Sequence, residues 1–96
     1  MTMTVGSLRL DFHIPASQSL KDKRRVVRSL KDRLRGKYNI ALAEVDFQDT
    51  HQRAALGIVS VATDRQQIER LFQNVRQEVE RNLPGDLLQA EIEILS

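Results

Sequence analysis

The sequence predicts an α+β fold of the ferredoxin-like type, in which two helices cover one face of a four-stranded antiparallel sheet. Two observations support this prediction. Four segments carry the alternation or the β-branched residues typical of strands, and two longer segments repeat apolar residues at helical spacing. Their order is βαββαβ, which two right-handed crossovers around one hairpin convert into a two-layer sandwich with strand order 4-1-3-2. Residues 1–96 are predicted to form this single domain.

The four predicted strands are, in chain order, residues 8–14, 38–46, 52–62 and 88–94. The first and the last alternate apolar and polar residues, which indicates half-buried strands. Pro15 ends the first strand, and the mostly polar segment 47–51 is expected to form the turn between the second and the third. Met1 to Thr4 are expected to be a frayed lead-in.

The first predicted helix covers residues 20–35. Ser19 is a natural N-cap, Asp22 completes a pair resembling a capping box, and Gly36 is expected to be the C-cap. The second helix begins after Thr63 or Asp64 and runs to about Leu83, because Pro84 and Gly85 follow. Its apolar stripe consists of Ile68, Leu71, Phe72, Val75, Val79 and Leu83.

The composition is that of an ordinary globular domain, with 41% hydrophobic and 29% charged residues. No apolar run has the length of a membrane span and no signal-peptide pattern begins the chain, so we expect a cytoplasmic location and no membrane partner. Because the chain has no cysteine, a disulfide framework, a thiolate metal site and a cysteine nucleophile are excluded.

Positive charge is concentrated in the first predicted helix. Residues 21–37 contain nine Lys and Arg against two Asp, a local charge of +7, whereas the whole chain has a net charge of +2. The rest of the chain therefore carries −5. Six of these cations share one flank of the helix and are predicted to contact RNA phosphates: Lys21, Arg24, Arg25, Arg28, Lys31 and Arg35. The alternative is a solvated helix face with no ligand.

Lys23 falls inside the apolar stripe of that helix, and it points toward one end of the predicted sheet. The topology brings the ends of strands one and two, the start of the helix and the start of strand three to this rim. A predicted anion site there consists of Ser17, Ser19, Lys23 and Arg53, with Lys21 nearby. Alternatively, Ser19 only caps the helix, and Lys23 and Arg53 form ion pairs, Lys23 with Glu44 or Asp46.

Catalytic and cofactor-binding devices are not predicted. His13, Asp46, Asp49 and His51 are a plausible ligand set for a metal, but HExxH and other short ligand spacings are missing, so we expect no metal site. The chain contains neither GxGxxG nor GxxxxGK[ST], and nothing in it supplies an activated nucleophile. We therefore expect no catalytic residue and no cofactor.

The predicted open face of the sheet bears on both nucleic-acid binding and self-association. It presents Arg9, Asp11 and His13 from the first strand and no aromatic residue from the third, so bases are not expected to stack on it as they do on an RRM. Strands two and three are apolar on both sides. An uncovered apolar patch of this kind favours a homo-oligomer. The alternative is a sheet face that only exposes small apolar residues to water.

Two runs, HIPASQSLKDKRRVVRSLKDRLRGKYN and AEVDFQDTHQRAALGIVSV, resemble the YlxP-like family of small bacterial proteins, and the resemblance extends from about Val5 to Leu95. It implies a ferredoxin-like fold and no established catalytic residue. Genes of this family often lie between those of transcription and translation factors, including a ribosome-binding factor, which implies work on RNA or ribosomes. Thr50 and His51 stand where the resemblance leads us to expect a bulkier apolar or aromatic residue, so a partner contact at that turn is not carried over.

Together these observations predict a non-enzymatic accessory factor that binds structured RNA or a ribosomal particle through the basic helix. The alternative from another class is a regulatory domain that binds a small ligand or anion at the rim and acts as an oligomer.

Overall fold

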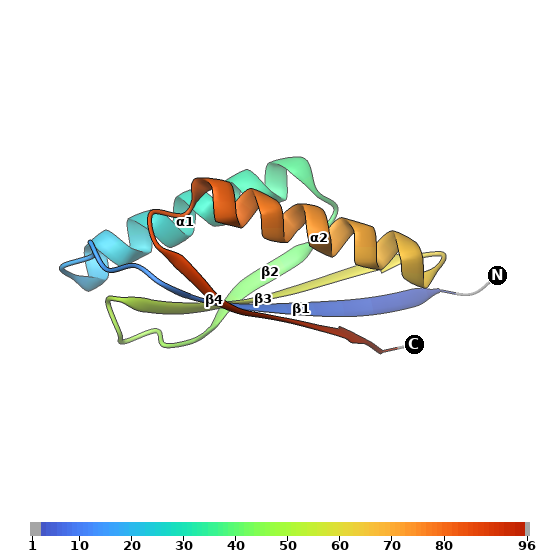
Figure 1. Cartoon of the computed structure of the whole chain (residues 1–96), viewed down its shortest axis with the longest axis horizontal. Helices are drawn as coiled ribbons and strands as arrows, with labels where there is room; N and C mark the ends of the chain where they lie inside the picture. The colour runs from blue at the N-terminus through green and yellow to red at the C-terminus, as the bar shows by residue number, and fades with distance from the viewer. Residues whose placement is uncertain (1–2, 96) are drawn as a thin grey trace.

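A computed structural model of the chain describes residues 3–95. Its six elements follow in the predicted order: β1 (Thr4–His13), α1 (Leu20–Lys37), β2 (Ala41–Asp46), β3 (Arg53–Ala62), α2 (Arg65–Asn82) and β4 (Asp86–Ile94). Figure 1 shows the two helices lying side by side in opposite directions above a single sheet. The predicted α+β, ferredoxin-like sandwich is confirmed.

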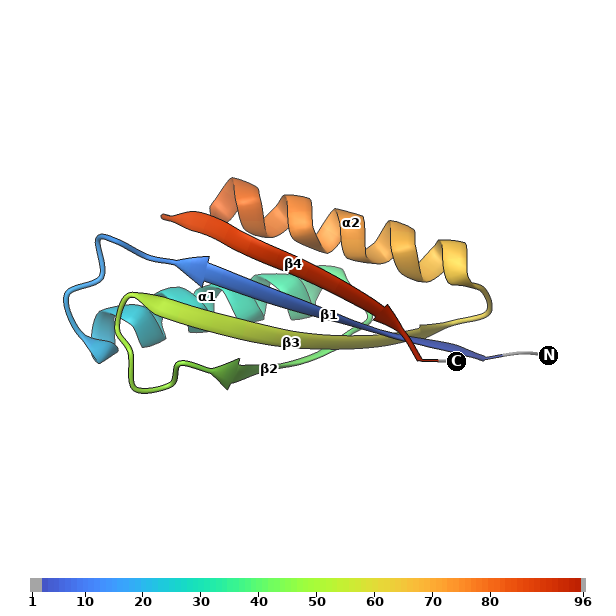
Figure 2. The ribbon, with the colours of Figure 1, turned by 60° about the horizontal axis from the view of Figure 1, so that its bottom comes forward.

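The sheet is antiparallel throughout, with strand order β2-β3-β1-β4. This is the predicted order 4-1-3-2, and Figure 2 shows the four strands in this sequence across the sheet. The two central strands, β1 and β3, pair along their whole length, from Thr4 opposite Ala62 to His13 opposite Arg53. The ladder of β1 and β4 shifts register between Asp11 and Phe12.

The core lies between the sheet and the two helices. Alternate residues of β1, among them Leu8, Leu10 and Phe12, face the helices and are fully buried. Ile68 and Phe72 of α2 are equally buried, since their spacing of four residues places both on the stripe that faces the sheet. The sequence pattern thus fixes which face of each element is covered.

The termini of several elements differ from the prediction. Thr4 is paired with Ala62 in β1 and is not frayed, because the long β3 extends alongside it; residues 1 and 2 lie outside the described part. Strand β2 begins at Ala41, since Tyr38 instead caps α1. Strand β4 begins at Asp86, two residues before the predicted start, because the chain pairs with β1 directly after the turn.

The N-caps are Ser19, as predicted, and Asp64, one of the two predicted candidates, whereas the predicted C-cap of α1 is wrong. The side chains of Ser19 and Asp64 accept the predicted hydrogen bonds, from the backbone N–H of Asp22 at 3.1 Å and of Gln67 at 2.9 Å. Gly36 is not the C-cap. It stays helical with a negative φ, and the helix continues to Lys37, whose side chain reaches α2, so the cap is Tyr38.

Candidate nucleic-acid interface on helix α1

Five cations of α1 form an uncompensated surface, called here the basic face: Lys21, Arg24, Arg25, Arg28 and Lys31. All are exposed except Lys31, which is half-buried, and none of them takes part in an ion pair with any residue of 3–95. A shallow hollow on the helix surface is lined by four of them together with Ser29 and Asp32. The basic face is therefore free to meet an anionic partner.

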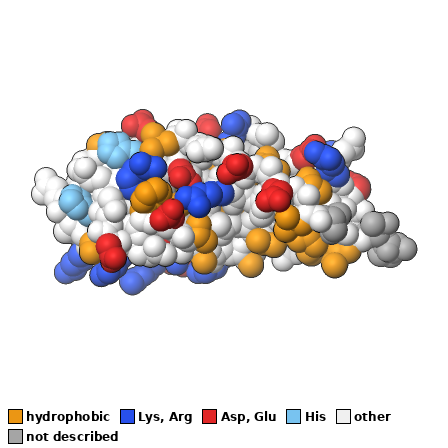
Figure 3. All heavy atoms as spheres, turned by 90° about the horizontal axis from the view of Figure 1, so that it is seen from below, with side chains coloured by type: hydrophobic (Ala, Val, Ile, Leu, Met, Phe, Trp, Pro, Cys, Tyr) orange, Lys and Arg blue, Asp and Glu red, His pale blue; other side chains and the backbone are white. Residues whose placement is uncertain are grey.

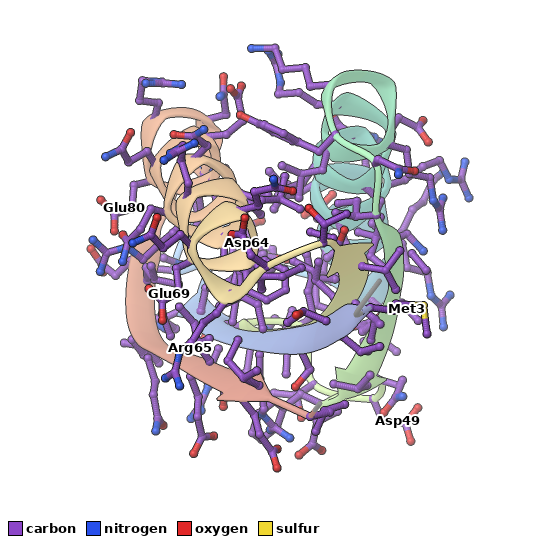
Figure 4. All side chains as sticks on the ribbon, turned by 90° about the vertical axis from the view of Figure 1, so that its right-hand side faces the viewer. Met3, Asp49, Asp64, Arg65, Glu69 and Glu80 are labelled. Carbon is purple, nitrogen blue, oxygen red and sulfur yellow. The ribbon has the colours of Figure 1, made fainter. Side chains whose placement is uncertain are left out.

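Most of the basic face turns away from α2, and Arg25 also lies beside the end of that helix. In Figure 4, Glu69 and Glu80 of α2 lie on the flank farthest from α1, and nitrogen-tipped side chains project from the opposite side of the molecule. Figure 3 shows Lys and Arg side chains projecting beyond one rim of the sheet. Five cations against Asp22 and Asp32 leave a local charge of +3 on this side, since the remaining cations of α1 have partners inside the protein.

Those remaining cations point to other elements. Arg35, the sixth predicted phosphate contact, donates a hydrogen bond to the carbonyl of Leu42 at 3.1 Å, which draws its guanidinium toward the edge of the sheet. Lys37 lies 2.9 Å and Arg33 3.8 Å from the carboxylate of Glu78 on α2. Part of the charge predicted for the RNA surface thus serves contacts between elements.

Glu78 joins the two helices and was not predicted from the sequence. Its side chain is buried and also contacts Arg81 at 3.1 Å and the side-chain amide of Asn82 at 2.8 Å. Hydrogen bonds from Lys37 and then Arg81 lower the pKa of Glu78, against the opposing effect of burial. The available signal was its position, three residues after Val75 and beside the apolar stripe of α2, as Lys23 lies within the stripe of α1.

Lys23 lies at the predicted rim and is almost completely buried. Its Nζ is 2.9 Å from Oε2 of Glu44, one of the two predicted partners, and donates hydrogen bonds to the carbonyl of Phe47 at 2.6 Å and, more weakly, to those of Gln48 and Arg53. A buried ammonium requires this compensation. Lys23 thus binds the turn between β2 and β3 to the first turns of α1.

The other predicted rim residues also have partners within the protein. The hydroxyl of Ser17, a buried residue, donates to the carbonyl of Ser19 at 3.1 Å. The guanidinium of Arg53 lies 4.4 Å above the ring of Phe47 and 3.9 Å from the carboxylate of Asp11. The structure brings Ser17, Ser19, Lys23 and Arg53 to one end of the molecule, as predicted, and the anion site remains a prediction.

The turn that Lys23 holds has an unusual backbone. Phe47 has a positive φ of 61°, and its N–H donates to Oδ1 of Asp46 at 2.8 Å. This hydrogen bond, and after it the contact with Arg9, lowers the pKa of Asp46. The same network raises the pKa of Arg9, mainly through its hydrogen bond with Asp11. Both groups are therefore charged at neutral pH, and the turn is held from both layers of the molecule.

The residues considered as metal ligands do not assemble into a site. Among residues 3–95, no three His, Asp or Glu side chains are placed to share a metal ion, and this applies to His13, Asp46, Asp49 and His51. Asp46 instead contacts Arg9 at 3.1 Å. His13 ends β1 and Asp46 ends β2, which are separated by β3 in the sheet, while Asp49 and His51 lie in the turn between β2 and β3.

The open face of the sheet separates into a charged and an apolar part. Figure 3 shows charged side chains over the middle of this face and apolar side chains gathered along one side. The apolar side lies over β2 and β3, where Val45, Val59 and Val61 are 42–49% exposed, and a shallow hollow includes Ala41, Ala43 and Gly57. This exposed apolar surface is where self-association was predicted, and the self-association remains a prediction.

The comparison with known families is decisive for the kind of protein. The family model described as "Protein of unknown function (DUF503)" matches residues 5–92, which is nearly the whole chain. The chain belongs to the DUF503 family. A curated relative of this DUF503 chain is "Uncharacterized protein YlxP" of Bacillus subtilis (strain 168), 40% identical over 71 residues that cover 74% of this chain and 77% of the relative. The YlxP-like resemblance is thereby confirmed.

Solved structures resemble this DUF503 chain in fold alone. The de novo designed protein Foldit4 has a TM-score of 0.59 and 13% identity, with 99% of this chain and 98% of that chain covered. The structural-genomics protein YJCS has a TM-score of 0.55 and 5% identity, covering 96% and 99%. A C-terminal segment of the alpha subunit of aIF2 from Pyrococcus abyssi has a TM-score of 0.53 and 15% identity, covering 95% of this chain and 49% of that chain. Within residues 3–95, neither helix has the length and apolar character needed to cross a bilayer.

Proposed function

We propose that this protein is a non-enzymatic accessory factor that binds the phosphate backbone of structured RNA, free or in a ribosomal particle, through the basic face. The observation that carries the proposal is the set of five cations on one side of α1, none of which has an acidic partner in residues 3–95. Cations without internal partners can each replace a counterion on a phosphate, which is the main source of affinity in such complexes.

The shape of the surface favours backbone contacts. Lys21 and Lys31 are ten residues apart, so the basic face extends over about 15 Å along the helix axis. Lys and Arg at successive helical turns follow a line of phosphates and carry no sequence information of their own. Selectivity would then depend on RNA shape or on a protein partner, as in other proteins that bind folded RNA.

The opposite face of the protein is unsuited to RNA. Its β4 strand presents Glu91 and Glu93, and the central cation Arg9 is already paired with Asp11 and Asp46. The strands β1 and β3 place no aromatic side chain on that face, since Phe12, the aromatic residue of β1, is buried under the helices. RNA is therefore expected on the helix layer and excluded from the sheet by charge.

Charge reversal on α1 tests this function. We expect Arg24→Glu/Arg28→Glu to weaken binding to ribosomal particles and to a structured RNA, and to reduce the salt slope of the binding constant by about 2, because each phosphate contact contributes about 1. The matched control is Arg65→Glu/Arg70→Glu, which changes the net charge equally on α2. Co-sedimentation over a salt series gives the result. Equal affinity of both variants and the wild type would refute the role of the basic face.

The alternative function, a small anion bound at the rim, has less support. An anion there would have to displace the protein oxygens that surround Lys23, including the Glu44 carboxylate at 2.9 Å. The affinity for a small anion at the rim should not change when the charges of Arg24 and Arg28 are reversed. The same experiment therefore separates the two functions.

We also propose that two copies associate through the open face of the sheet, on the side formed by β2 and β3. The exposed valines there adjoin a network in which Arg9 and Arg53 are already matched by Asp11 and Asp46. These charges already compensate one another within the chain. A partner that covers them therefore buries no unpaired charge. A second copy would leave both basic faces free on the outside.

A further inference from the structure

A cleft lies between the basic helix and the end of α2. Its floor consists of Val26 and Leu30 of α1 and Leu83 after α2, and its volume is about 260 Å³. Arg25, Ser29 and Arg33, spaced four residues apart, line the α1 side, and Asn82 and Pro84 line the other. An apolar floor with a few polar groups at its rim is the usual composition of a site for a small organic group.

The rim of the cleft is held in place by Glu78. This buried carboxylate contacts Arg33 at 3.8 Å and the side-chain amide of Asn82 at 2.8 Å, and Asn82 also donates to the carbonyl of Glu78 at 2.8 Å. Both contacts of Asn82 use its amide nitrogen, and among residues 3–95 no hydrogen bond to its side-chain carbonyl oxygen is found, so this oxygen can accept one from a ligand. Hydrogen bonds from Lys37 and Arg81 lower the pKa of Glu78, so the carboxylate that contacts both rim residues is ionised at neutral pH.

The cleft is continuous with the basic face. Arg25 and Ser29 line both the cleft and the hollow formed by Lys21, Arg24 and Arg28. A group that fits the cleft would therefore be flat, so that it can rest on aliphatic side chains and arginine planes. It would carry hydrogen-bond donors and acceptors at its edge. It would also be linked to negative charge that lies on the adjoining basic face. An unpaired nucleobase with its phosphates combines these properties.

We propose that the cleft receives one unpaired nucleobase of the bound RNA, while the basic face holds the neighbouring phosphates. The base would rest on Val26, Leu30 and Leu83, between the guanidinium groups of Arg25 and Arg33. Ser29 and the free carbonyl of Asn82 would contact its edge. The inference rests on the proposed function and adds to it a substrate class: structured RNA with a bulged or looped-out nucleotide.

The test compares the binding of two RNAs, and it uses a variant in which a larger side chain fills the cleft without changing its charge. The probes are an RNA stem with a single bulged 2-aminopurine and the same stem fully paired. We expect the wild type to prefer the bulged stem about tenfold, a typical contribution of one stacked base, and to quench the 2-aminopurine fluorescence. Ser29 is exposed, so Ser29→Phe should fold while occluding the cleft. It should bind both stems with the affinity that the wild type has for the paired one.

Controls separate this inference from the proposed function. Gln66→Phe adds the same ring at the exposed, opposite end of α2 and should keep the preference of the wild type. The smaller filler Ser29→Gln should show an intermediate loss, which guards against a folding defect in Ser29→Phe. If the wild type binds both stems equally and Arg24→Glu/Arg28→Glu weakens both, the cleft inference fails alone. If the wild type binds neither stem, both proposals fail. A preference that survives in Ser29→Phe also overturns the cleft site.

Discussion

A single lysine explains how the two layers of this protein are joined at one end. Lys23 could be identified from the sequence because a cation inside an apolar stripe needs a buried partner, and Glu44 lies at a strand end that the topology brings to it. The three carbonyl groups of Phe47, Gln48 and Arg53 could not be predicted. The carbonyl groups of Phe47 and Gln48 lie in a turn in which Phe47 has a left-handed conformation, for which a non-glycine residue gives no sequence signal.

Replacing Lys23 by methionine should therefore destabilise the protein. Methionine has nearly the length of lysine but no charge, so Glu44 loses its counter-ion and three carbonyl oxygens lose a donor. We expect the free energy of unfolding to fall by about 3 kcal/mol, as for other buried ion pairs broken on one side. Urea denaturation at pH 7 measures the change, and the double variant Lys23→Met/Glu44→Met should recover part of it. A Lys23→Met protein of unchanged stability would contradict the role assigned to this contact.

At the scale of elements, residue type predicts where the helices begin but not where α1 ends. Ser19 and Asp64 were predictable N-caps because few side chains can accept a hydrogen bond from the first turn. Gly36 was expected to end α1, but glycine permits a left-handed cap without requiring one. The helix continues because Lys37 gains the Glu78 carboxylate and Tyr38 gains contacts with the core. These tertiary contacts are not visible in the local sequence.

The corrected end of α1 predicts that Gly36→Ala stabilises the protein. Apart from the adjoining helix backbone and chain neighbours, a Cβ added at this position meets no atom of residues 3–95 within 4 Å, and alanine loses less backbone entropy than glycine when it folds. We expect a gain of about 0.5 kcal/mol in the free energy of unfolding, measured by thermal or urea denaturation. The matched control is Gly6→Ala, whose Cβ would lie 2.5 Å from Ile68 and should destabilise the core. A lower free energy of unfolding in Gly36→Ala would instead indicate that Gly36 is the C-cap of α1.

For the whole molecule, element order was sufficient to predict the strand order, because handedness and short connections leave few arrangements of βαββαβ. The asymmetric charge likewise indicated a basic helix before its position was known. What the sequence could not supply was the pairing of residues from separate elements. Glu78 removes Arg33 and Lys37 from the basic surface, and the same residue shapes the cleft beside α2. Such pairings arise only when α1 and α2 lie side by side.

The division of the molecule into a basic helix layer and an apolar sheet side leads to a prediction about assembly. If two copies meet through β2 and β3, the wild type should sediment with twice the mass of the chain. Val59→Lys should yield a monomer, because it places a charge in the middle of the exposed apolar strip. Gln77→Lys adds the same charge to the exposed side of α2 and should leave the dimer intact. Because the basic faces lie outside this interface, the Val59→Lys monomer should bind a short RNA stem as the wild type does. Analytical ultracentrifugation and RNA titration give the two answers, and a wild-type monomer at high concentration would exclude the interface while leaving the RNA surface untouched.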